Sequence, residues 1–275
     1  MSGQPFRGSS NQYPCGVITL TTDFGLRDPF VGVMKGQMLG RFPDAKLVDL
    51  THDILAHWPA EAGFWLARSF QYFPRGTVHV AVVDPGVGTK RDIVAVEADG
   101  HIFLAPDNGL LASVITRTSG ARIYRIESSH LVPLGIGTPS ATFHGRDIFA
   151  PMAAEIAVGR VRPASLGEQI VEVVPSWIDD PTVTDTSVSG VVITVDHFGN
   201  LITNIDAAAL TKFEAPVVRA GAQEFPLRRT YGDARPGDYL ALINSFAVLE
   251  IARAEQSAAA GLGLGRGAPV IVHSK

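Results

Sequence analysis

Strand-like and helix-like segments alternate through the first part of the chain. Apolar and β-branched runs cover residues 17–21, 46–50, 77–83, 93–97, 101–104 and 121–126. Helix-like stretches lie between several of them, at residues 31–41, 60–73, 108–117 and 148–159. Near-continuous apolar strands separated by amphipathic helices are typical of a parallel sheet that is covered on both faces. The alternation therefore predicts an α/β N-terminal domain with a largely parallel central sheet.

The pattern changes after about residue 162. Residues 163–187 are rich in Pro, Asp, Ser and Thr, which predicts a linker with a surface loop. Short strand-like runs follow at residues 190–195, 201–205, 216–219, 224–227, 239–243, 247–252 and 269–273, and residues 257–267 predict a hairpin loop. Such closely spaced strands indicate a small antiparallel barrel or sandwich. We expect a flexible N-terminal tail at 1–16, an α/β domain at 17–175 and an all-β C-terminal barrel domain at 186–275.

Composition excludes several classes of function. Apolar residues make up 46% of the 275 residues, which indicates an ordered globular chain, and the formal charge of −4 without a basic run argues against nucleic-acid binding. Cys15 is the only cysteine, so no disulfide forms within the chain. There is no signal-like apolar segment at the N-terminus and no apolar run near 18 residues, so we expect a cytoplasmic protein without membrane contact.

Acidic residues follow the predicted strands of the first part, at Asp23, Asp53, Asp84 and Asp107. Ligands bind beyond the carboxyl ends of the strands in sheets of this kind. Asp23, in the segment TTDFGLRDPFVG, either caps the next helix or grips the hydroxyl groups of a ligand. Asp53 and Asp107 are expected to be cap or turn residues.

The segment DPGVGTKR places Asp84 and Arg91 seven positions apart, around two glycines that allow close backbone approach. It is either a tight turn with a surface ion pair or an active-site loop. His144, in FHGRDIFAP, lies at the entrance of a predicted helix and is either structural or in contact with substrate. HxH, HExxH and DxD spacings are absent, which argues against a metal-dependent phosphoesterase.

Two segments of the second part carry further polar residues. Asp196 and Asn200 surround a Phe-Gly turn in DHFGNLITN, and Asn244 and Ser245 lie in INSFAVLEIA. Asn, Asp, Gly and Ser are common in turns for local reasons, so ordinary hairpin chemistry accounts for either segment as well as ligand binding does.

Taken in order, these motifs resemble one family. The series TTDFG, VGVMKG, THDI, FPRGTVHVAVVDPGVGTKR, PDNGLL, FHGRDIFAP, VDHFGNLITNI and INSFAVLEIA is similar to the S-adenosylmethionine (SAM) hydrolases, also called SAM hydroxide adenosyltransferases. These are relatives of the enzymes that fluorinate and chlorinate the same substrate. The resemblance covers residues 17–272.

The resemblance implies an N-terminal α/β domain, a C-terminal β-barrel and a homotrimer, with the site between one subunit's N-terminal domain and a neighbour's C-terminal domain. It also implies the reaction, in which water or hydroxide attacks C5′ of the SAM ribose and gives adenosine and L-methionine. Its Asp–Arg–His set falls on Asp84, Arg91 and His144. Arg91 would stabilise developing hydroxide, Asp84 would hold Arg91, and His144 would orient the water or take its proton.

The resemblance assigns the remaining site residues to the substrate. Asp23 would bind the ribose hydroxyls, and Trp58 and Phe143 would line the pocket around the ribose and sulfonium. Asp196 and Asn200 would bind the methionine end of SAM. Asn244 and Ser245 would contact the adenine edge. Gly145 and Phe198 are further substrate-binding positions. The resemblance also implies that SAM is the substrate and that no cofactor or metal is needed.

Two alternatives follow from the same residues. A SAM- or adenosine-binding sensor with negligible turnover would use the same pocket, but the intact Asp84–Arg91–His144 set favours an enzyme. A SAM-dependent halogenase is disfavoured, because the halogenating relatives carry Tyr followed by Ser or Gly where this chain has His144 and Gly145. A further departure from the family pattern is Phe246, which stands where a relative uses Arg beside the adenine.

Overall fold

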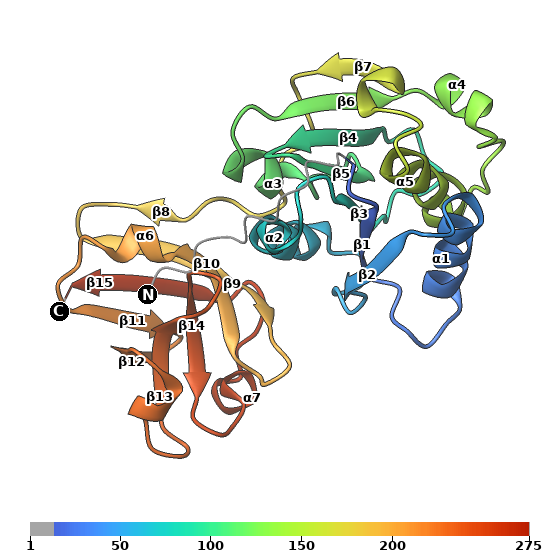
Figure 1. Cartoon of the computed structure of the whole chain (residues 1–275). Helices are drawn as coiled ribbons and strands as arrows, with labels where there is room; N and C mark the ends of the chain where they lie inside the picture. Colours follow the sequence, from blue (N-terminus) through green and yellow to red (C-terminus); the bar gives the residue numbers. More distant parts are fainter. Residues whose placement is uncertain (1–13, 275) are drawn as a thin grey trace. The chain divides into compact units, whose positions relative to one another are not determined.

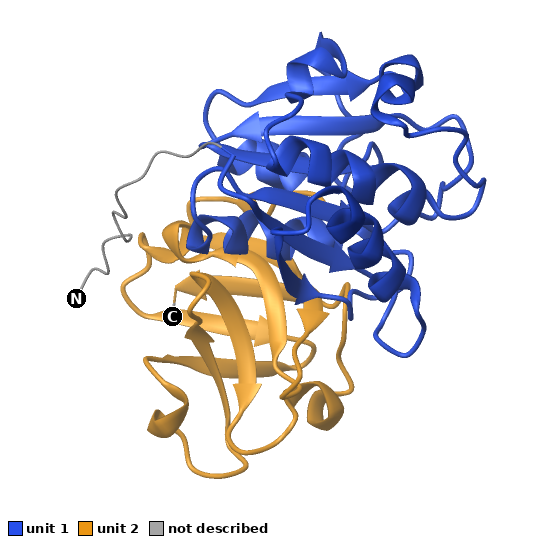
Figure 2. Cartoon of the chain, turned by 45° about the vertical axis from the view of Figure 1, so that its right-hand side comes forward, with its two compact units in different colours: residues 1–178 blue, residues 179–275 orange. Residues whose placement is uncertain are grey.

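The computed structural model describes residues 14–274, which divide into two compact units, one that ends at Ile178 and one that begins at Asp179 (Figure 2). The predicted flexible tail at 1–16 lies mostly outside the described residues. Of its last members, Cys15 donates its backbone N–H to the Gly76 carbonyl, and Gly16 accepts from the Lys46 N–H. These two residues are therefore fixed beside the sheet.

The first unit is built around a seven-stranded sheet with the order β2-β1-β3-β5-β4-β6-β7 (Figure 1). Its strands are β1 (Val17–Thr22), β2 (Lys46–Thr51), β3 (Val78–Val82), β4 (Ile93–Ala98), β5 (His101–Pro106), β6 (Arg122–Ile126) and β7 (Gly167–Ile170). The pairings make β1, β2, β3, β5 and β6 run in one direction, with β4 and β7 opposed to them. The predicted largely parallel sheet is confirmed.

Helices cover both faces of this sheet. On one face lie α1 (Phe30–Arg41) and α5 (Ala150–Ala157), and on the other α2 (Pro59–Ser69) and α3 (Ala112–Arg117). The side chains of the central strand β3 alternate between the two faces of the sheet. Val80 and Val82 pack in the hydrophobic core on the side of α1 and α5, and Ala81 packs in the core on the side of α2 and α3. Shorter helical turns are Phe70–Tyr72, α4 (Ser128–Leu131), Val132–Leu134, the π-helical Gly145–Phe149, and Pro163–Ser165.

The second unit is a closed β-barrel, as predicted. Its strands are β8 (Thr182–Val183), β9 (Ser187–Val195), β10 (Leu201–Asp206), β11 (Pro216–Ala220), β12 (Gln223–Arg228), β13 (Tyr239–Ile243), β14 (Val248–Arg253) and β15 (Pro269–Ser274). The ring runs β9-β10-β14-β13-β12-β11-β15 and returns to β9, and β8 pairs with β9 outside it. All ring pairings are antiparallel except β12 with β13, which is parallel. Short helical segments are α6 (Ala207–Leu210), Tyr231–Asp233 and α7 (Ala258–Leu262).

Two local predictions were wrong. Residues 163–187 are not only linker and loop, because β7 lies within them and extends the first sheet by pairing with β6. Residues 257–267 are not a plain hairpin loop, because they contain α7. The Ser257 side chain caps that helix by accepting the N–H of Ala260 at 3.1 Å.

The sheet register brings the predicted strand-end residues to one edge. Thr22 at the end of β1 pairs with Val82 of β3, and Val80 of β3 pairs with Leu104 of β5. The chain leaves all three strands at the same edge, so the segments that contain Asp23, Asp84 and Asp107 emerge side by side.

Candidate active site

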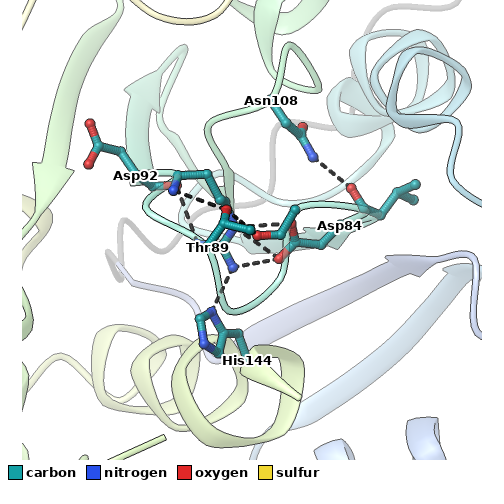
Figure 3. Close-up of polar contacts among 8 residues, drawn as sticks. Asp84, Thr89, Asp92, Asn108 and His144 are labelled. Carbon is teal, nitrogen blue, oxygen red and sulfur yellow. Dashed lines mark hydrogen bonds and ion pairs between the residues drawn. The ribbon is translucent and has the colours of Figure 1, made fainter. Parts of the chain in front are cut away.

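Arg91 is hydrogen-bonded to both Asp84 and His144, so the three side chains form one continuous set (Figure 3). The Arg91 Nε lies 3.0 Å from both carboxylate oxygens of Asp84, and its Nη2 lies 2.5 Å from Asp84 Oδ2. The same Nη2 lies 2.7 Å from Nδ1 of His144. The side chains of Arg91 and Asp84 are only 10% and 5% exposed, so this pair is not a surface ion pair. The interpretation of DPGVGTKR as a turn with a surface ion pair is therefore excluded.

The loop from Asp84 to Arg91 is shaped by its glycines and by Thr89. The Thr89 hydroxyl donates to the Gly86 carbonyl at 2.7 Å and accepts from the Arg91 N–H at 3.4 Å. Gly88 has a φ of +75°, and a Cβ atom there would lie 2.1 Å from the Ala141 carbonyl oxygen. The loop therefore packs backbone to backbone on the segment just before His144, and only glycine fits at this contact.

His144 precedes the π-helical turn Gly145–Phe149 that leads into α5. Its neighbour Phe143 makes edge-to-face contacts with Phe24 and Phe30, at centroid distances of 5.8 and 5.4 Å. Gly145 is buried, and a Cβ atom on it would lie 3.1 Å from the Met34 sulfur. π-helical turns occur frequently at functional sites, and here close packing on both sides of His144 fixes the direction of its ring.

The hydrogen bond from Arg91 also defines the proton position on His144. A guanidinium has only donors, so Nδ1 of His144 accepts, and the neutral ring carries its proton on Nε2. Burial, followed by the positive charge of Arg91, lowers the pKa of His144, while Asp84 and Asp147 oppose this in part. At neutral pH the Nε2–H is thus a donor. This geometry favours orientation of a water oxygen over removal of its proton.

Asn108 supports the site and was not singled out by sequence reasoning. Its Nδ2 donates to the Val83 carbonyl at 2.8 Å (Figure 3). Its Oδ1 accepts the Leu110 N–H at 3.3 Å. Val83 is the residue before Asp84, so this bond fixes the end of β3. The signal was available in PDNGLL, where Asn108 follows the strand-end residue Asp107.

Asp23 and Trp58 lie on two loops that are joined to each other. Asp23 does not cap α1, which begins after Pro29 without a side-chain cap. Its Oδ2 accepts the backbone N–H of His57 at 2.9 Å. Trp58, half-buried at the start of α2, packs edge to face on Trp177 at 5.5 Å. Asp53 is exposed, and Asp107 accepts the Val174 N–H at 2.9 Å, as expected for turn residues.

In the barrel, Asp196 organises the turn between β9 and β10. Its Oδ1 accepts the N–H groups of Phe198 and Asn200 at 2.9 and 2.8 Å, and its Oδ2 accepts Nδ2 of Asn200 at 2.9 Å. Asn200 is 6% exposed, whereas Phe198 is 75% exposed. The structure brings these three predicted residues together and presents the Phe198 ring to solvent.

A second cluster in the barrel contains Asn244 and two residues that sequence reasoning missed. Glu250, only 2% exposed, accepts the Tyr231 hydroxyl at 2.6 Å and Nδ2 of Asn244 at 3.2 Å. Burial raises the pKa of Glu250, the two hydrogen bonds lower it, and Asp196 raises it. Burial raises the pKa of Tyr231, the hydrogen bond to Glu250 and the charge of Glu250 raise it further, and Asp196 adds to the same direction. The turn that contains Asp196 therefore acts electrostatically on this polar group. Ser245 is exposed.

The charged residue in the otherwise apolar run VLEIA was the signal for Glu250. Leu249 and Ile251, its neighbours along β14, belong to the barrel core, so Glu250 points to the outer face of the barrel. Tyr231 lies in a loop whose sequence gives no comparable signal.

Within residues 14–274, no group of three or more His, Cys, Asp or Glu side chains is arranged to hold a metal ion. The helices of the same part of the chain are too short or too polar to cross a membrane.

The chain therefore consists of an α/β domain with a polar site at the edge of its sheet, followed in the sequence by a closed β-barrel. Residues 18–167 match the model of the SAM hydroxide adenosyltransferase N-terminal domain, and residues 190–271 match that of the C-terminal domain. The chain belongs to the SAM hydroxide adenosyltransferase family.

Individual relatives agree with this assignment. The chain is 37% identical to the (R)-S-adenosyl-L-methionine hydrolase of Thermus thermophilus, over 90% of this chain and 96% of the relative. It is 30% identical to the fluorinase of an Actinoplanes species, over 86% of this chain and 90% of the relative. A crystal structure of an uncharacterized conserved protein from Thermotoga maritima superimposes with a TM-score of 0.84 at 33% identity, covering 93% of this chain and 99% of that one.

Proposed function

We propose that this protein hydrolyses SAM to adenosine and L-methionine. A water oxygen forms a bond to C5′ of the ribose while the C5′–S bond breaks. The electron pair of that bond passes to the sulfonium sulfur, which leaves as the neutral thioether of methionine, and the proton of the water is released to solvent. Because the leaving group is neutral, no general acid is needed, and activation of water is the difficult part.

The hydrogen-bonded set of Asp84, Arg91 and His144 is the observation that carries this proposal. Arg91 bears a fixed positive charge in a largely buried position, where an electrostatic interaction with developing hydroxide is stronger than in water. Asp84 holds the guanidinium through three contacts, and Arg91 in turn holds Nδ1 of His144, which leaves the Nε2–H of His144 to donate to the water oxygen. Together they orient the nucleophile for in-line attack.

The remaining assignments are part of the same proposal. Asp23 binds the ribose hydroxyls through its carboxylate, and Trp58 and Phe143 border the ribose and sulfonium, where an aromatic face suits a cation. In the barrel, Asp196 and Asn200 hold the methionine end, and Asn244 serves the adenine edge. The structure supports Asn244 better than Ser245, because Asn244 is fixed by Glu250.

Hydrolysis is favoured over halogenation. Relatives named SAM hydrolase match at 33–37% identity, whereas the fluorinases match at 29–30%. In addition, His144 engages Arg91 directly, and this contact is expected to serve a water nucleophile rather than a halide.

Product analysis tests the proposal. Purified protein is incubated with SAM, with and without fluoride or chloride, and the products are separated and identified by mass. Adenosine and methionine in equal amounts, independent of halide, are expected. Formation of a 5′-halo-adenosine would refute hydrolysis and show halogenation instead. SAM that is bound tightly but not converted would identify the protein as a sensor.

We also propose a homotrimer that works in the cytoplasm without a metal or cofactor. Light scattering on the purified protein measures its mass, and three times 29.3 kDa is expected. Activity that survives dialysis against a chelator is the second expected result.

A further inference from the structure

One buried histidine near the site has no place in the proposed reaction. His52 is 3% exposed and lies in the loop that follows β2. Its Nδ1 lies 2.8 Å from the Thr22 hydroxyl. Its Nε2 lies 3.0 Å from Oδ1 of Asp49, without the alignment of a hydrogen bond. A buried imidazole is costly unless its nitrogens meet polar partners, so these two contacts fix the ring.

The contacts of His52 extend into a relay that ends beside Asp23. On the far side, Lys35 of α1 donates to Asp49 at 2.6 Å. On the near side, Thr22 Oγ1 accepts the backbone N–H of Phe24 at 3.2 Å. In one arrangement the His52 ring is protonated on Nε2, which faces the Asp49 carboxylate. Its Nδ1 then accepts the Thr22 O–H, and the Thr22 oxygen can accept the Phe24 N–H at the same time. The last member is the peptide directly after Asp23.

The same loops are also joined through the backbone. The Gly25 N–H donates to the His52 carbonyl at 2.8 Å, and the Ile54 N–H donates to the Thr22 carbonyl at 3.4 Å. His57 has a φ of +63°, which is unfavourable for a residue with a side chain, and its N–H is held by Asp23. The residue that follows is Trp58. The positions of Asp23 and Trp58 thus depend on how these two loops are joined.

We propose that His52 is the positioning residue that fixes the Asp23 carboxylate for the ribose hydroxyls of the substrate. This inference rests on the proposed function, in which Asp23 binds those hydroxyls. The Asp23 Oδ2 atom is already engaged by His57, and among residues 14–274 nothing donates to Oδ1, which is the atom left for a ribose. If the turn at Thr22 relaxed, this oxygen would move, whereas Asp84, Arg91 and His144 are held by their own hydrogen bonds and would stay in place.

Selectivity for the ribose hydroxyls distinguishes positioning from a merely structural role. The binding of adenosine and of 2′,3′-dideoxyadenosine is measured by calorimetry, and the ratio of the two Kd values is compared between variants. A site built to bind hydroxyls should reject the dideoxy compound by about tenfold or more. Adenosine is not consumed by hydrolysis, so the ratio does not depend on turnover.

Four variants make the test specific. His52→Leu and Thr22→Val should each bring the ratio to within about threefold of one, because the charge-assisted contacts of Asp23 are lost. His52→Asn should keep most of the selectivity, because the Asn oxygen lies near the position of Nδ1. His101→Leu is the control, since His101 is also buried in this unit but lies at the start of β5, and it should leave the ratio unchanged. Thermal unfolding confirms that each variant is folded.

A folded His52→Leu or Thr22→Val protein with the parent's ratio would overturn the inference. A parent ratio near one would also overturn it, because Asp23 would then not bind the ribose. The proposed function is checked separately by conversion of SAM. A parent protein that selects adenosine but leaves SAM intact would refute hydrolysis and leave the role of His52 standing.

Discussion

At the scale of single residues, the site depends on the shape of the Arg91 side chain as well as on its charge. The planar guanidinium reaches both oxygens of Asp84 and Nδ1 of His144 at the same time. A lysine carries the same charge but cannot bridge both partners in one plane. We therefore expect Arg91→Lys and Arg91→Ala each to lower kcat by about a hundredfold or more, with the Kd for SAM within about threefold of the parent value. Steady-state kinetics and calorimetry measure these two effects.

The exposed Arg219, on β11 of the barrel, provides the matched control. Arg219→Ala should leave both constants at the parent values. If Arg91→Lys retained the parent kcat, the bridging role of the guanidinium would be wrong.

His144 makes the activity dependent on pH in a defined direction. Its pKa is lowered below 6.5, so the neutral ring that accepts from Arg91 predominates at neutral pH. As the pH falls through this lowered pKa, Nδ1 gains a proton and can no longer accept. We expect kcat/KM to be constant near pH 7 and to fall on an acid limb whose midpoint lies below 6.5.

His144→Asn offers the test of this assignment. It keeps an oxygen near Nδ1 but does not titrate, so its lower activity should lack the acid limb. An identical limb in the variant would assign the titration to another group.

At the scale of elements, the loop from Asp84 to Arg91 must pack on the segment before His144. Gly88→Ala places a Cβ atom 2.1 Å from the Ala141 carbonyl oxygen, at a φ of +75°. The loop must then move away, which separates Arg91 from His144, and we expect kcat to fall about tenfold or more. Hydrolysis rates and thermal unfolding of the variant are measured together.

Gly120→Ala separates backbone strain from the clash. Gly120 has a φ of +64°, but an added Cβ there meets nothing within 4 Å. This variant should lose about 1 kcal/mol of stability and keep the parent kcat. Equal effects of the two substitutions on kcat would show that the packing of the loop is unimportant.

Local sequence signals predicted these elements to different degrees. Asp84 and Arg91 were predictable as a pair because both flank a glycine loop after a buried strand. Their contact with His144, 53 positions away from Arg91, came from the resemblance and not from spacing. The strand β7 was missed because its sequence GEQI is polar and half exposed, as suits an edge strand, and carries no apolar alternation. Glu250 and Tyr231 meet because β14 pairs with β13 and the connection between β12 and β13 lies over Glu250, and no local pattern marks this contact.

At the scale of the whole molecule, the two units differ in what their sequences revealed. In the first, alternating helices and apolar strands predicted both faces of the sheet, but not that β4 would run against its neighbours. In the second, the short strands predicted a barrel or a sandwich, and the pairing of β9 with β10 decides for the barrel. β9 and β10 are consecutive strands joined by the Asp196 turn, so their pairing is local. The pairings of β10 with β14 and of β15 with β9 join strands far apart in the sequence, and local patterns do not encode them.

Buried histidines should make the first unit sensitive to acid. His79 Nδ1 lies 2.8 Å from the Thr19 hydroxyl, and its Nε2 lies 3.1 Å from His101 Nδ1. Burial lowers the pKa of His79 well below 6.5 and that of His101 to about 4. The folded state therefore binds protons less readily than the unfolded chain. Its stability should be complete above pH 6.5 and should be lost as the pH falls from there through about 4.

Denaturant unfolding between pH 7 and 4, followed by tryptophan fluorescence, measures this loss. The three tryptophans, Trp58, Trp65 and Trp177, all lie in the first unit and report on it alone. His101→Asn keeps a polar partner for His79 but removes one titrating group. The slope of the free energy of unfolding against pH should therefore fall by the contribution of about one proton at most. A parent protein with pH-independent stability over this range would contradict the account of the buried pair.

The central claim is that the Asp84–Arg91–His144 set directs water to C5′ of SAM. The most direct measurement is hydrolysis of SAM in ¹⁸O-labelled water, followed by mass analysis of both products. The account predicts one labelled oxygen in the 5′-hydroxyl of adenosine, none in methionine, and labelled adenosine from the Arg91→Ala protein at no more than about a hundredth of the parent rate. Label incorporated into any other position, or at the parent rate by Arg91→Ala, would contradict it.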